Sequence, residues 1–272
     1  MVRSLWTAAS GMLAQQNNVD TIANNLANVN TTGYKTETVE FKSLLYQDTQ
    51  SKTTSANGDL KPVSAQIGLG VRNASITSNF RTGSFFETQN ATSFAIEGDG
   101  FFAVQGEDGN KYYTKNGDFK VVLGSGDKLM LTTSSGEAIL DSKGAKIVFD
   151  GDIVASKLTI NAQGEFMYPN ENNNPELLGI KMGLFQFSNP AGLEKEGNSL
   201  YAETAASGPA LNESTNANLE KSSLAQGYLE GSNVQVVDEM VNMIVAQRAY
   251  EMNSKAIQAS DEMMQQANQL RN

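Results

Sequence analysis

The stretch NNLANVNTTGYK, residues 24–35, carries four asparagines and no charge before Lys35. It continues a helical pattern, although asparagine is a poor helix former. Two β-branched threonines then come before Gly33, and glycine is common just past the end of a helix. We therefore expect a helix that starts near the beginning of the chain and ends near Asn30.

The residues before this stretch repeat every seven positions. One series consists of Leu5, Met12, Val19 and Leu26. A second series, three positions further on, consists of Ala8, Gln15, Ile22 and Val29. Two such series are typical of the a and d positions of a coiled coil, with one polar interruption.

The other face of this helix is rich in amides and hydroxyls. Between Leu5 and Val29 the only charged residue is Asp20, although a solvated helix usually carries charges. Uncharged amides cost less to bury than ions do. We therefore expect this face to be covered by neighbouring copies, with interface residues Asn24, Asn25 and Asn28. The alternative is a solvated helix of unusual composition.

The last forty residues show a second helical pattern. One heptad series consists of Val236, Met243, Tyr250, Ile257 and Met264. A flanking series, one position earlier, consists of Ala249, Ala256, Met263 and Leu270. Ser232 or Asn233 is expected as the N-cap, and Met240 as a packing residue. The simplest way to bury both terminal seams is to pair them with each other.

The middle of the chain has the pattern of short strands. FFAVQGEDGNKYYTKNGDFKVV predicts three strands with turns at Asp108-Gly109 and Asn116-Gly117. KLTINAQGEFMYP predicts a hairpin, and LGIKMGLFQF a further strand. The predicted fold is mixed α and β, with N- and C-terminal helices paired as a coiled coil around a central all-β domain. The expected segments are an N-terminal helical segment 1–45, an extended polar loop 46–66, a central β domain 67–230 and a C-terminal helix 231–272.

Composition narrows the function classes. The chain has no cysteine and no histidine, which removes thiolate chemistry, the commonest general base and the commonest transition-metal ligand. Its net charge of −10 argues against nucleic acid as a partner. EGDGFF is followed by a strand pattern, so it lacks the helix that a phosphate-binding loop needs. We expect no enzyme activity, metal or cofactor, no transmembrane segment and no cleavable signal peptide.

Three quoted stretches resemble one family. SLWTAASGMLAQQNNVDTIANNLANVNTTGYK, FAIEGDGFFAV and the segment from GYLEGSNVQVVDEM to the last leucine resemble the signatures of flagellar basal-body rod proteins, in the family order. QIGLGVR, residues 66–72, resembles the subunits of the distal rod, whereas LEGSNV, residues 229–234, also resembles those of the proximal rod.

The resemblance implies a bacterial axial protein of the flagellum, used in motility. Its terminal helices would form the inner coiled-coil layer of a helical polymer that transmits torque from motor to hook. The implied partners are copies of itself, other rod and hook proteins, the P and L rings and the type III export apparatus. The implied location is the periplasmic rod of the basal body. The expected assembly interface consists of Leu5, Met12, Val19, Ile22, Asn24, Asn25, Leu26, Asn28, Val29, Gly33, Val236, Met240, Met243, Tyr250, Ile257 and Met264.

Two other function classes fit parts of the sequence. A periplasmic glycan-acting enzyme could use two carboxylates of the acidic β region, but no spacing singles out such a pair. A surface adhesin with a coiled-coil stalk would carry one continuous heptad segment, whereas here the heptads are split between the two ends.

Overall fold

The computed structural model describes residues 2–50, 65–124, 128–151, 153–170, 174–216 and 219–270. These residues divide into two compact units. The helical unit takes the described residues within Met1–Ala27, Glu37–Thr77 and Gln235–Asn272, and the β unit takes those within Asn28–Thr36 and Ser78–Val234. The fold is therefore mixed, with a helix near each end of the chain and a β-rich region between them, as the sequence predicted.

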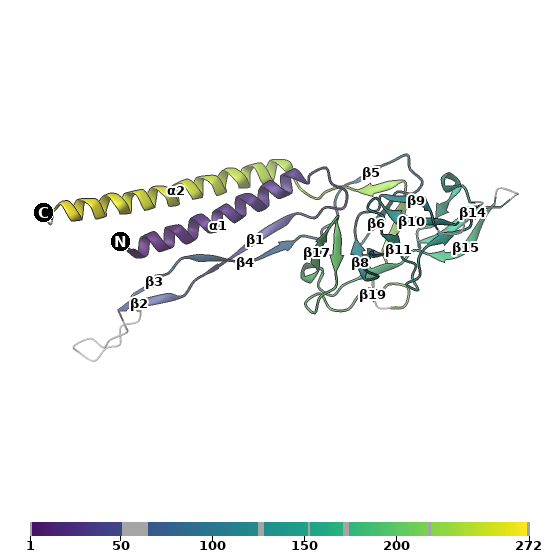
Figure 1. Ribbon diagram of the computed structural model, residues 1–272, viewed down its shortest axis with the longest axis horizontal. Coiled ribbons are helices and arrows are strands. Elements are labelled where there is room, and N and C mark those ends of the chain that lie inside the picture. The colour runs from purple at the N-terminus through teal and green to yellow at the C-terminus, as the bar shows by residue number, and fades with distance from the viewer. Residues whose placement is uncertain are drawn as a thin grey trace. The chain divides into compact units, whose positions relative to one another are not determined.

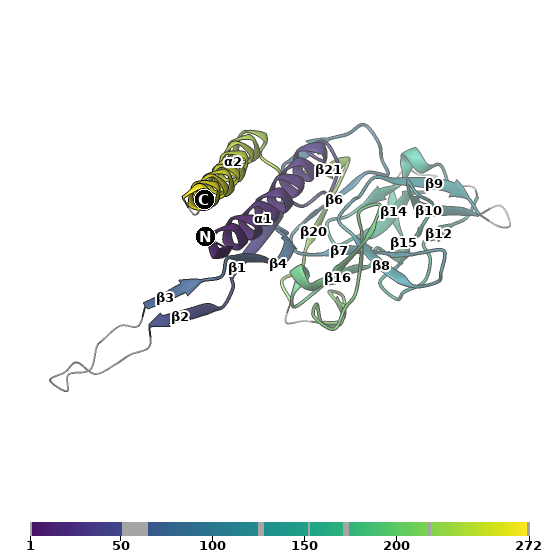
Figure 2. The same cartoon turned by 60° about the vertical axis from the view of Figure 1, so that its left-hand side comes forward.

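The helical unit contains α1 (Val2–Ala27) and α2 (Val236–Gln269), which lie side by side (Figures 1 and 2). α1 ends at Ala27, three residues before the expected Asn30. A turn follows the helix, closed by a hydrogen bond from Thr31 N to Asn28 O. α2 carries Asp238 and Glu239 in its first turn, where negative charges interact favourably with the helix dipole. Within the described residues, neither helix has a stretch that is both long and apolar enough to cross a membrane.

A hairpin arm completes the helical unit. Its paired strands are β1 (Glu37–Ser43) with β4 (Val71–Ser78), and β2 (Tyr46–Gln50) with β3 (Ala65–Gly68). The expected helical segment 1–45 is therefore helical only up to Ala27, because the chain forms a strand from Glu37. The expected polar loop 46–66 begins and ends in strands, and its residues 51–64 lie outside the described residues.

The β unit is built around a sheet that has ten strands in the described part of the chain. Its main path is β12 (Val148–Phe149), β10 (Leu129–Thr133), β11 (Ala138–Ile139), β7 (Phe101–Gln105), β8 (Lys111–Thr114), β18 (Leu200–Ala202) and β17 (Glu194–Gly197). Off this path, β9 (Phe119–Leu123) pairs with β10, while β16 (Leu184–Gln186) pairs with β7 and β19 (Leu211–Asn212). The paired strands of this sheet are antiparallel, as expected where short turns join neighbouring strands.

Smaller sheets complete this unit. Their strands are β13 (Thr159–Ile160), β14 (Glu165–Pro169) and β15 (Pro175–Lys181) in one sheet, β6 (Phe94–Glu97) with β20 (Ser223–Gln226), and β5 (Phe85–Glu87) with β21 (Tyr228–Glu230). Short 3₁₀ turns lie at Ala155–Lys157 and Pro190–Gly192.

The core of the β unit lies on both sides of β7. Phe102 and Val104 pack into one apolar cluster, and Phe101 and Ala103 into a second, as the alternation of side chains along a strand requires. All four side chains are fully buried. EGDGFF thus leads into the central strand of a sheet and no helix follows it, which agrees with the strand interpretation of this motif.

The turn signals were mostly correct. Gly109 and Gly164 have positive φ, and each lies in a turn between two of the expected strands. LGIKMGLFQF, however, forms the end of β15 and then β16, because the ladder is interrupted at Met182 and Gly183. A Cβ at Gly183 would lie 2.8 Å from Asp141 O, so the close approach of another segment breaks the strand there.

Candidate assembly surfaces

α1 and α2 run antiparallel in one register. The hydroxyls of Ser4 and Ser260 lie 3.2 Å apart, and at the other end Asn25 Nδ2 donates to Glu239 Oε2 at 3.1 Å. Between them, a Cβ at Gly11 would lie 2.9 Å from Asn253 Nδ2. Position numbers in each pair have the same sum, as two antiparallel helices without a register shift require.

The face of α2 toward α1 differs from the expected seam. The residues that contact or approach α1 recur every seven positions and are small or polar, namely Glu239, Asn253 and Ser260, with the buried Ala246 in the same series. The half-buried Met243, Ile257 and Met264 belong to the expected apolar series. In the flanking series Ala249 is half-buried, whereas Ala256, Met263 and Leu270 are exposed. Close approach at Gly11 favours small partners over the large apolar residues that the pattern selected.

α1 lies between α2 and the hairpin arm. Its buried residues are Ala8, Ala14, Thr21, Ile22 and Asn25. On the hairpin side, Ser10 Oγ accepts a hydrogen bond from Val71 N at 3.3 Å, and a Cβ at Gly70 would lie 2.1 Å from the same hydroxyl oxygen. A small side chain at position 10 and glycine at position 70 are thus needed for the arm to lie against the helix.

Asn25, which was expected at the assembly interface, is buried within the subunit. It is 1 % exposed. Its Nδ2 donates to Glu37 O at 2.8 Å and to Glu239 Oε2, and its Oδ1 accepts from Glu37 N at 2.9 Å. The amide therefore ties α1 to the start of the hairpin and to the first turn of α2. The neighbouring Asn24 is exposed and Asn28 is half-buried.

The outer side of α2 carries a large exposed apolar surface. It consists of Val237, Met240, Val241, Ile244 and Val245, which we call the α2 outer face. Between 53 and 74 % of each residue is exposed. Contiguous apolar surface of this kind marks an interaction site in a soluble protein. Of these residues, the sequence analysis had selected only Met240, as a packing residue. It passed over the other four because they lie outside the heptad series.

α1 and the hairpin add further exposed apolar side chains. Trp6, which is the single tryptophan of the chain, is 72 % exposed, and Leu13 is 66 % exposed one heptad later. On the hairpin, the exposed apolar residues are Phe41, Leu45, Tyr46, Ile67, Leu69 and Ile76. All three parts of the helical unit thus carry exposed apolar side chains.

The remaining expected interface residues fall into two groups. Half-buried residues are Leu5, Met12, Val19, Leu26 and Val29. Val236 and Tyr250 are 38 and 42 % exposed, and Tyr250 lines a groove with Val19, Gln16, Gln247 and Glu251. Of these residues, Val19 of α1 and Tyr250 of α2 meet in this groove, which places them at the pairing of the two helices.

Gly33, which was expected at the assembly interface, belongs to the β unit and lies against another segment of its own chain. It has φ +70°, and a Cβ there would lie 2.8 Å from Asn116 N. Its N–H donates to Glu230 O at 2.8 Å. Glycine is required here by the left-handed backbone and by the close approach of another segment.

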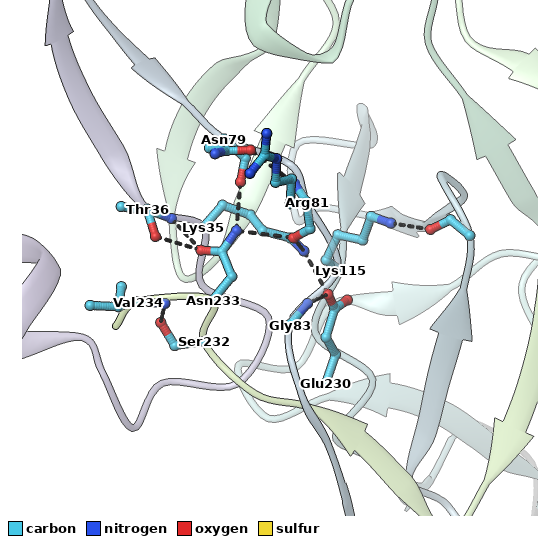
Figure 3. Close-up of polar contacts among 11 residues, drawn as sticks. Lys35, Thr36, Asn79, Arg81, Gly83, Lys115, Glu230, Ser232, Asn233 and Val234 are labelled. Carbon is cyan, nitrogen blue, oxygen red and sulfur yellow. Dashed lines mark hydrogen bonds and ion pairs between the residues drawn. The ribbon is translucent and has the colours of Figure 1, made fainter. Parts of the chain in front are cut away.

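Lys35, the last residue of the opening stretch, forms a buried ion pair in the β unit. Its Nζ lies 2.6 Å from Glu230 Oε1 and donates to Arg81 O at 2.9 Å (Figure 3). Gly83 N donates to the same Glu230 Oε1 at 2.8 Å. Both charged side chains are almost completely buried. The sequence analysis missed this pair because its members are 195 positions apart.

Asn233, expected as an N-cap of the second helix, lies in the same network. Its Oδ1 accepts from Thr36 N at 2.7 Å and Thr36 Oγ1 at 2.6 Å, and its Nδ2 donates to Asn79 O and Arg81 O (Figure 3). The N-cap of α2 is Gln235, which makes no side-chain cap. The N-cap expectation was wrong because the amide of Asn233 is used to join separate segments of the β unit.

Lys115 is a second buried lysine close to this network. Its Nζ donates to Gly98 O at 2.8 Å and lies 5.0 Å from the centre of the Phe101 ring. Burial lowers the pKa of Lys115 to about 8, and the negative charge of Glu230 opposes that effect. A lysine that is charged at neutral pH in this position therefore costs stability.

The β unit also has a hollow of about 260 Å³ lined by residues that include Glu213, Lys181 and Lys221. Both oxygens of Glu213 are engaged, since Ser222 N and Ser222 Oγ donate to them and Gln186 Nε2 donates to Oε1. A single carboxylate held in this way does not provide the acid and base pair that glycoside hydrolysis needs. Among the described residues, no group of three acidic side chains is placed to hold a metal ion.

Comparison with known proteins gives the same family along the whole chain. Residues 5–35 match the family model described as flagella basal body rod protein, and residues 95–168 match the flagellar hook protein FlgE/F/G D1 domain. Residues 225–270 match the flagellar basal body rod FlgEFG protein C-terminal model.

Full-length relatives agree with these matches. The chain is 42 % identical over 276 residues to the flagellar basal-body rod protein FlgG of Borreliella burgdorferi, covering 100 % of this chain and 99 % of the relative. It is 37 % identical to FlgG of Agrobacterium fabrum, covering 96 and 97 % of the two chains. A flagellar hook-basal body complex protein of Bacillus subtilis, FlhP, is 30 % identical over the full length of both chains.

Proposed function

Because this chain belongs to the family of flagellar basal-body rod proteins, we propose that it builds the distal section of the rod. It is a structural subunit of the flagellar basal body and not an enzyme. The observation that carries the family assignment is likeness to FlgG proteins over the full length of the chain, with both terminal signatures present.

The distal position is favoured over the proximal one by the two competing motifs. QIGLGVR, which resembles distal subunits, lies in β3, the turn after it and the start of β4, where side chains of the hairpin arm are exposed. LEGSNV, which also resembles proximal subunits, contains Glu230 and Asn233, and both have internal roles. A motif needed for folding says little about position in the rod, so the exposed motif carries more weight.

Assembly is proposed to run through the helical unit. The α1–α2 pair would act as an antiparallel coiled-coil element of the inner layer of a helical tube, with the α2 outer face against a neighbouring copy. Its five apolar residues would then leave water, which contributes roughly 25 cal/mol per Å² buried. Trp6, Leu13 and the exposed residues of the hairpin arm are proposed as further contacts.

The proposed partners follow from this position. They are copies of the same chain, other rod proteins, the hook and the P and L rings that surround a rod in the periplasm. The subunit would reach this place through the flagellar export channel, and in the assembled rod it would transmit torque from motor to hook.

Labelled electron microscopy of isolated basal bodies tests the distal position. An antibody raised against this chain is expected to mark the rod next to the hook, on the outer side of the P ring. Label confined to the end of the rod next to the motor would instead support the proximal subunit. Absence of label from basal bodies that contain the protein in a blot would count against a rod position altogether.

A further inference from the structure

Three connecting segments of the chain meet inside the β unit. The N-terminal connector, residues 28–36, joins α1 to β1. The middle connector, residues 79–84, joins β4 to β5, and the C-terminal connector, residues 231–234, joins β21 to α2. In the sequence, the helices and the hairpin arm are thus joined to the β unit only through these short segments.

A charged contact joins the three connectors. Lys35 comes from the N-terminal connector and Glu230 immediately precedes the C-terminal one, while Arg81 O and Gly83 N belong to the middle connector (Figure 3). Glu230 Oε1 accepts hydrogen bonds from Lys35 Nζ and Gly83 N. Glu230 Oε2 is buried and has no hydrogen-bond partner among the described residues. Loss of either donor therefore leaves a buried carboxylate with little compensation, which is a large penalty.

A neutral contact joins the same segments a second time. Asn233 of the C-terminal connector binds Thr36 of the N-terminal one and the carbonyls of Asn79 and Arg81 in the middle one. Asn79 N in turn donates to Thr36 O at 2.8 Å. Arg81 O accepts from both Lys35 and Asn233, so the charged and the neutral contact share an acceptor.

We propose that Lys35, Glu230 and Asn233 form a latch that fixes the N-terminal and C-terminal connectors only when both are in place. Neither end has its full set of partners alone, because the buried ion pair takes its cation from residue 35 and its anion from residue 230. The N-terminal, middle and C-terminal connectors are therefore fixed together or released together. This coupling does not depend on the position of the subunit in the rod.

Hydrogen exchange of the full-length protein tests the coupling with reporters that do not touch the substituted residue. In Glu230→Gln, the Thr36 amide, which is bonded to Asn233, is expected to exchange about tenfold faster or more. In Asn233→Ala, which leaves no unpaired charge, the Gly83 amide, which is bonded to Glu230, is expected to accelerate in the same direction. The Leu140 amide, bonded to Ala103 O in the core, should change much less in both variants.

Glu213→Gln is the matched control. Glu213 is also a buried, hydrogen-bonded carboxylate of the β unit, but its bonds to Ser222 and Gln186 involve none of the connectors. It should not accelerate Thr36 and Gly83 selectively over Leu140. The latch is contradicted if each variant affects only the amide bonded to the replaced side chain. It is equally contradicted if Leu140 accelerates as much as the connector amides, because the loss is then general.

Discussion

Single residues decide how the opening stretch is used. Its asparagines were expected to form one interface. The side chain of Asn25, however, makes hydrogen bonds within the chain, to the backbone of Glu37 and the carboxylate of Glu239. Lys35 is likewise buried against Glu230. The sequence shows that these side chains are unusual for a solvated helix and its end. It does not show whether an amide meets its own chain or another, because that depends on partners distant in sequence.

Lys115 should give the stability of the β unit a recognisable pH dependence. Its pKa is about 8 in the fold and 10.5 when unfolded, so between these values the unfolded chain holds a proton that the folded one has lost. Stability therefore rises with pH across this window, by on the order of 3 kcal/mol in total. Chemical unfolding of wild type and Lys115→Met from pH 7 to 10.5 measures it, and the rise should be missing from the variant. An equal rise of the free energy of unfolding with pH in both proteins would contradict the burial penalty.

Gly33→Ala should destabilise the β unit more than Gly136→Ala. Both glycines have positive φ, so both alanines are strained. A Cβ at position 33 also meets Asn116 N at 2.8 Å, whereas at position 136 nothing lies within 4 Å. We expect Gly33→Ala to cost about 1–3 kcal/mol more in urea unfolding. Equal losses would show that the close approach at position 33 relaxes without penalty.

Helices and strands were largely predictable where local pattern decides. The heptads of α1 and the glycine turns of the β hairpins are visible in sequence because periodicity and positive φ are local properties. The seam of α2 was half wrong, since Asn253 and Ser260 were passed over in favour of large apolar residues. Antiparallel contact with Gly11 and Ser4 decides in favour of small and polar side chains there. The strands at 37–50 were missed because residues 1–45 were assigned to a helical segment and 46–66 to a polar loop. Val71–Ser78, expected in the central β domain, pairs with Glu37–Ser43 in the helical unit.

A cysteine pair tests the antiparallel register of the two helices. The chain has no native cysteine, so Ser4→Cys with Ser260→Cys introduces the only two thiols, at hydroxyls that lie 3.2 Å apart. We expect a disulfide within one chain under mild oxidation, seen as faster migration on a non-reducing gel. Ser4→Cys with Ser254→Cys is the control, because six residues displace the thiol by about 9 Å along the helix. A disulfide of equal yield in the control would contradict the register.

The whole molecule combines a self-contained β unit with a helical unit whose surface is incomplete. The β unit buries two aromatic clusters around β7. The helical unit instead exposes the α2 outer face, Trp6 and much of the hairpin arm. The absence of cysteine and histidine made an enzyme less expected, and the family signatures pointed to the function. The position of the apolar surface on α2 required the structure, because only the register against α1 shows which side faces outward.

Ile244→Glu should prevent rod assembly without unfolding the subunit. Ile244 is 57 % exposed in the α2 outer face, so a carboxylate is solvated in the free chain but buried in a subunit contact, at several kcal/mol when unpaired. Motility and rod length in basal bodies should fall, while the thermal transition of the purified protein stays the same. Gln258→Glu places the same charge at an exposed polar position of α2 and should assemble normally. Normal rods from Ile244→Glu would remove this face from the interface.

The most direct test of assembly through the α2 outer face is the accessibility of one thiol in subunit and polymer. Val241 is 54 % exposed, and Val241→Cys introduces a single cysteine into the chain. Its rate of maleimide labelling is measured in the purified subunit and in rods isolated from cells that make this variant. The account predicts fast labelling of the subunit and labelling at least about tenfold slower in the rod, as burial in a packed interface requires. Equal rates in both states would show that this face is open to solvent in the rod and would contradict the account.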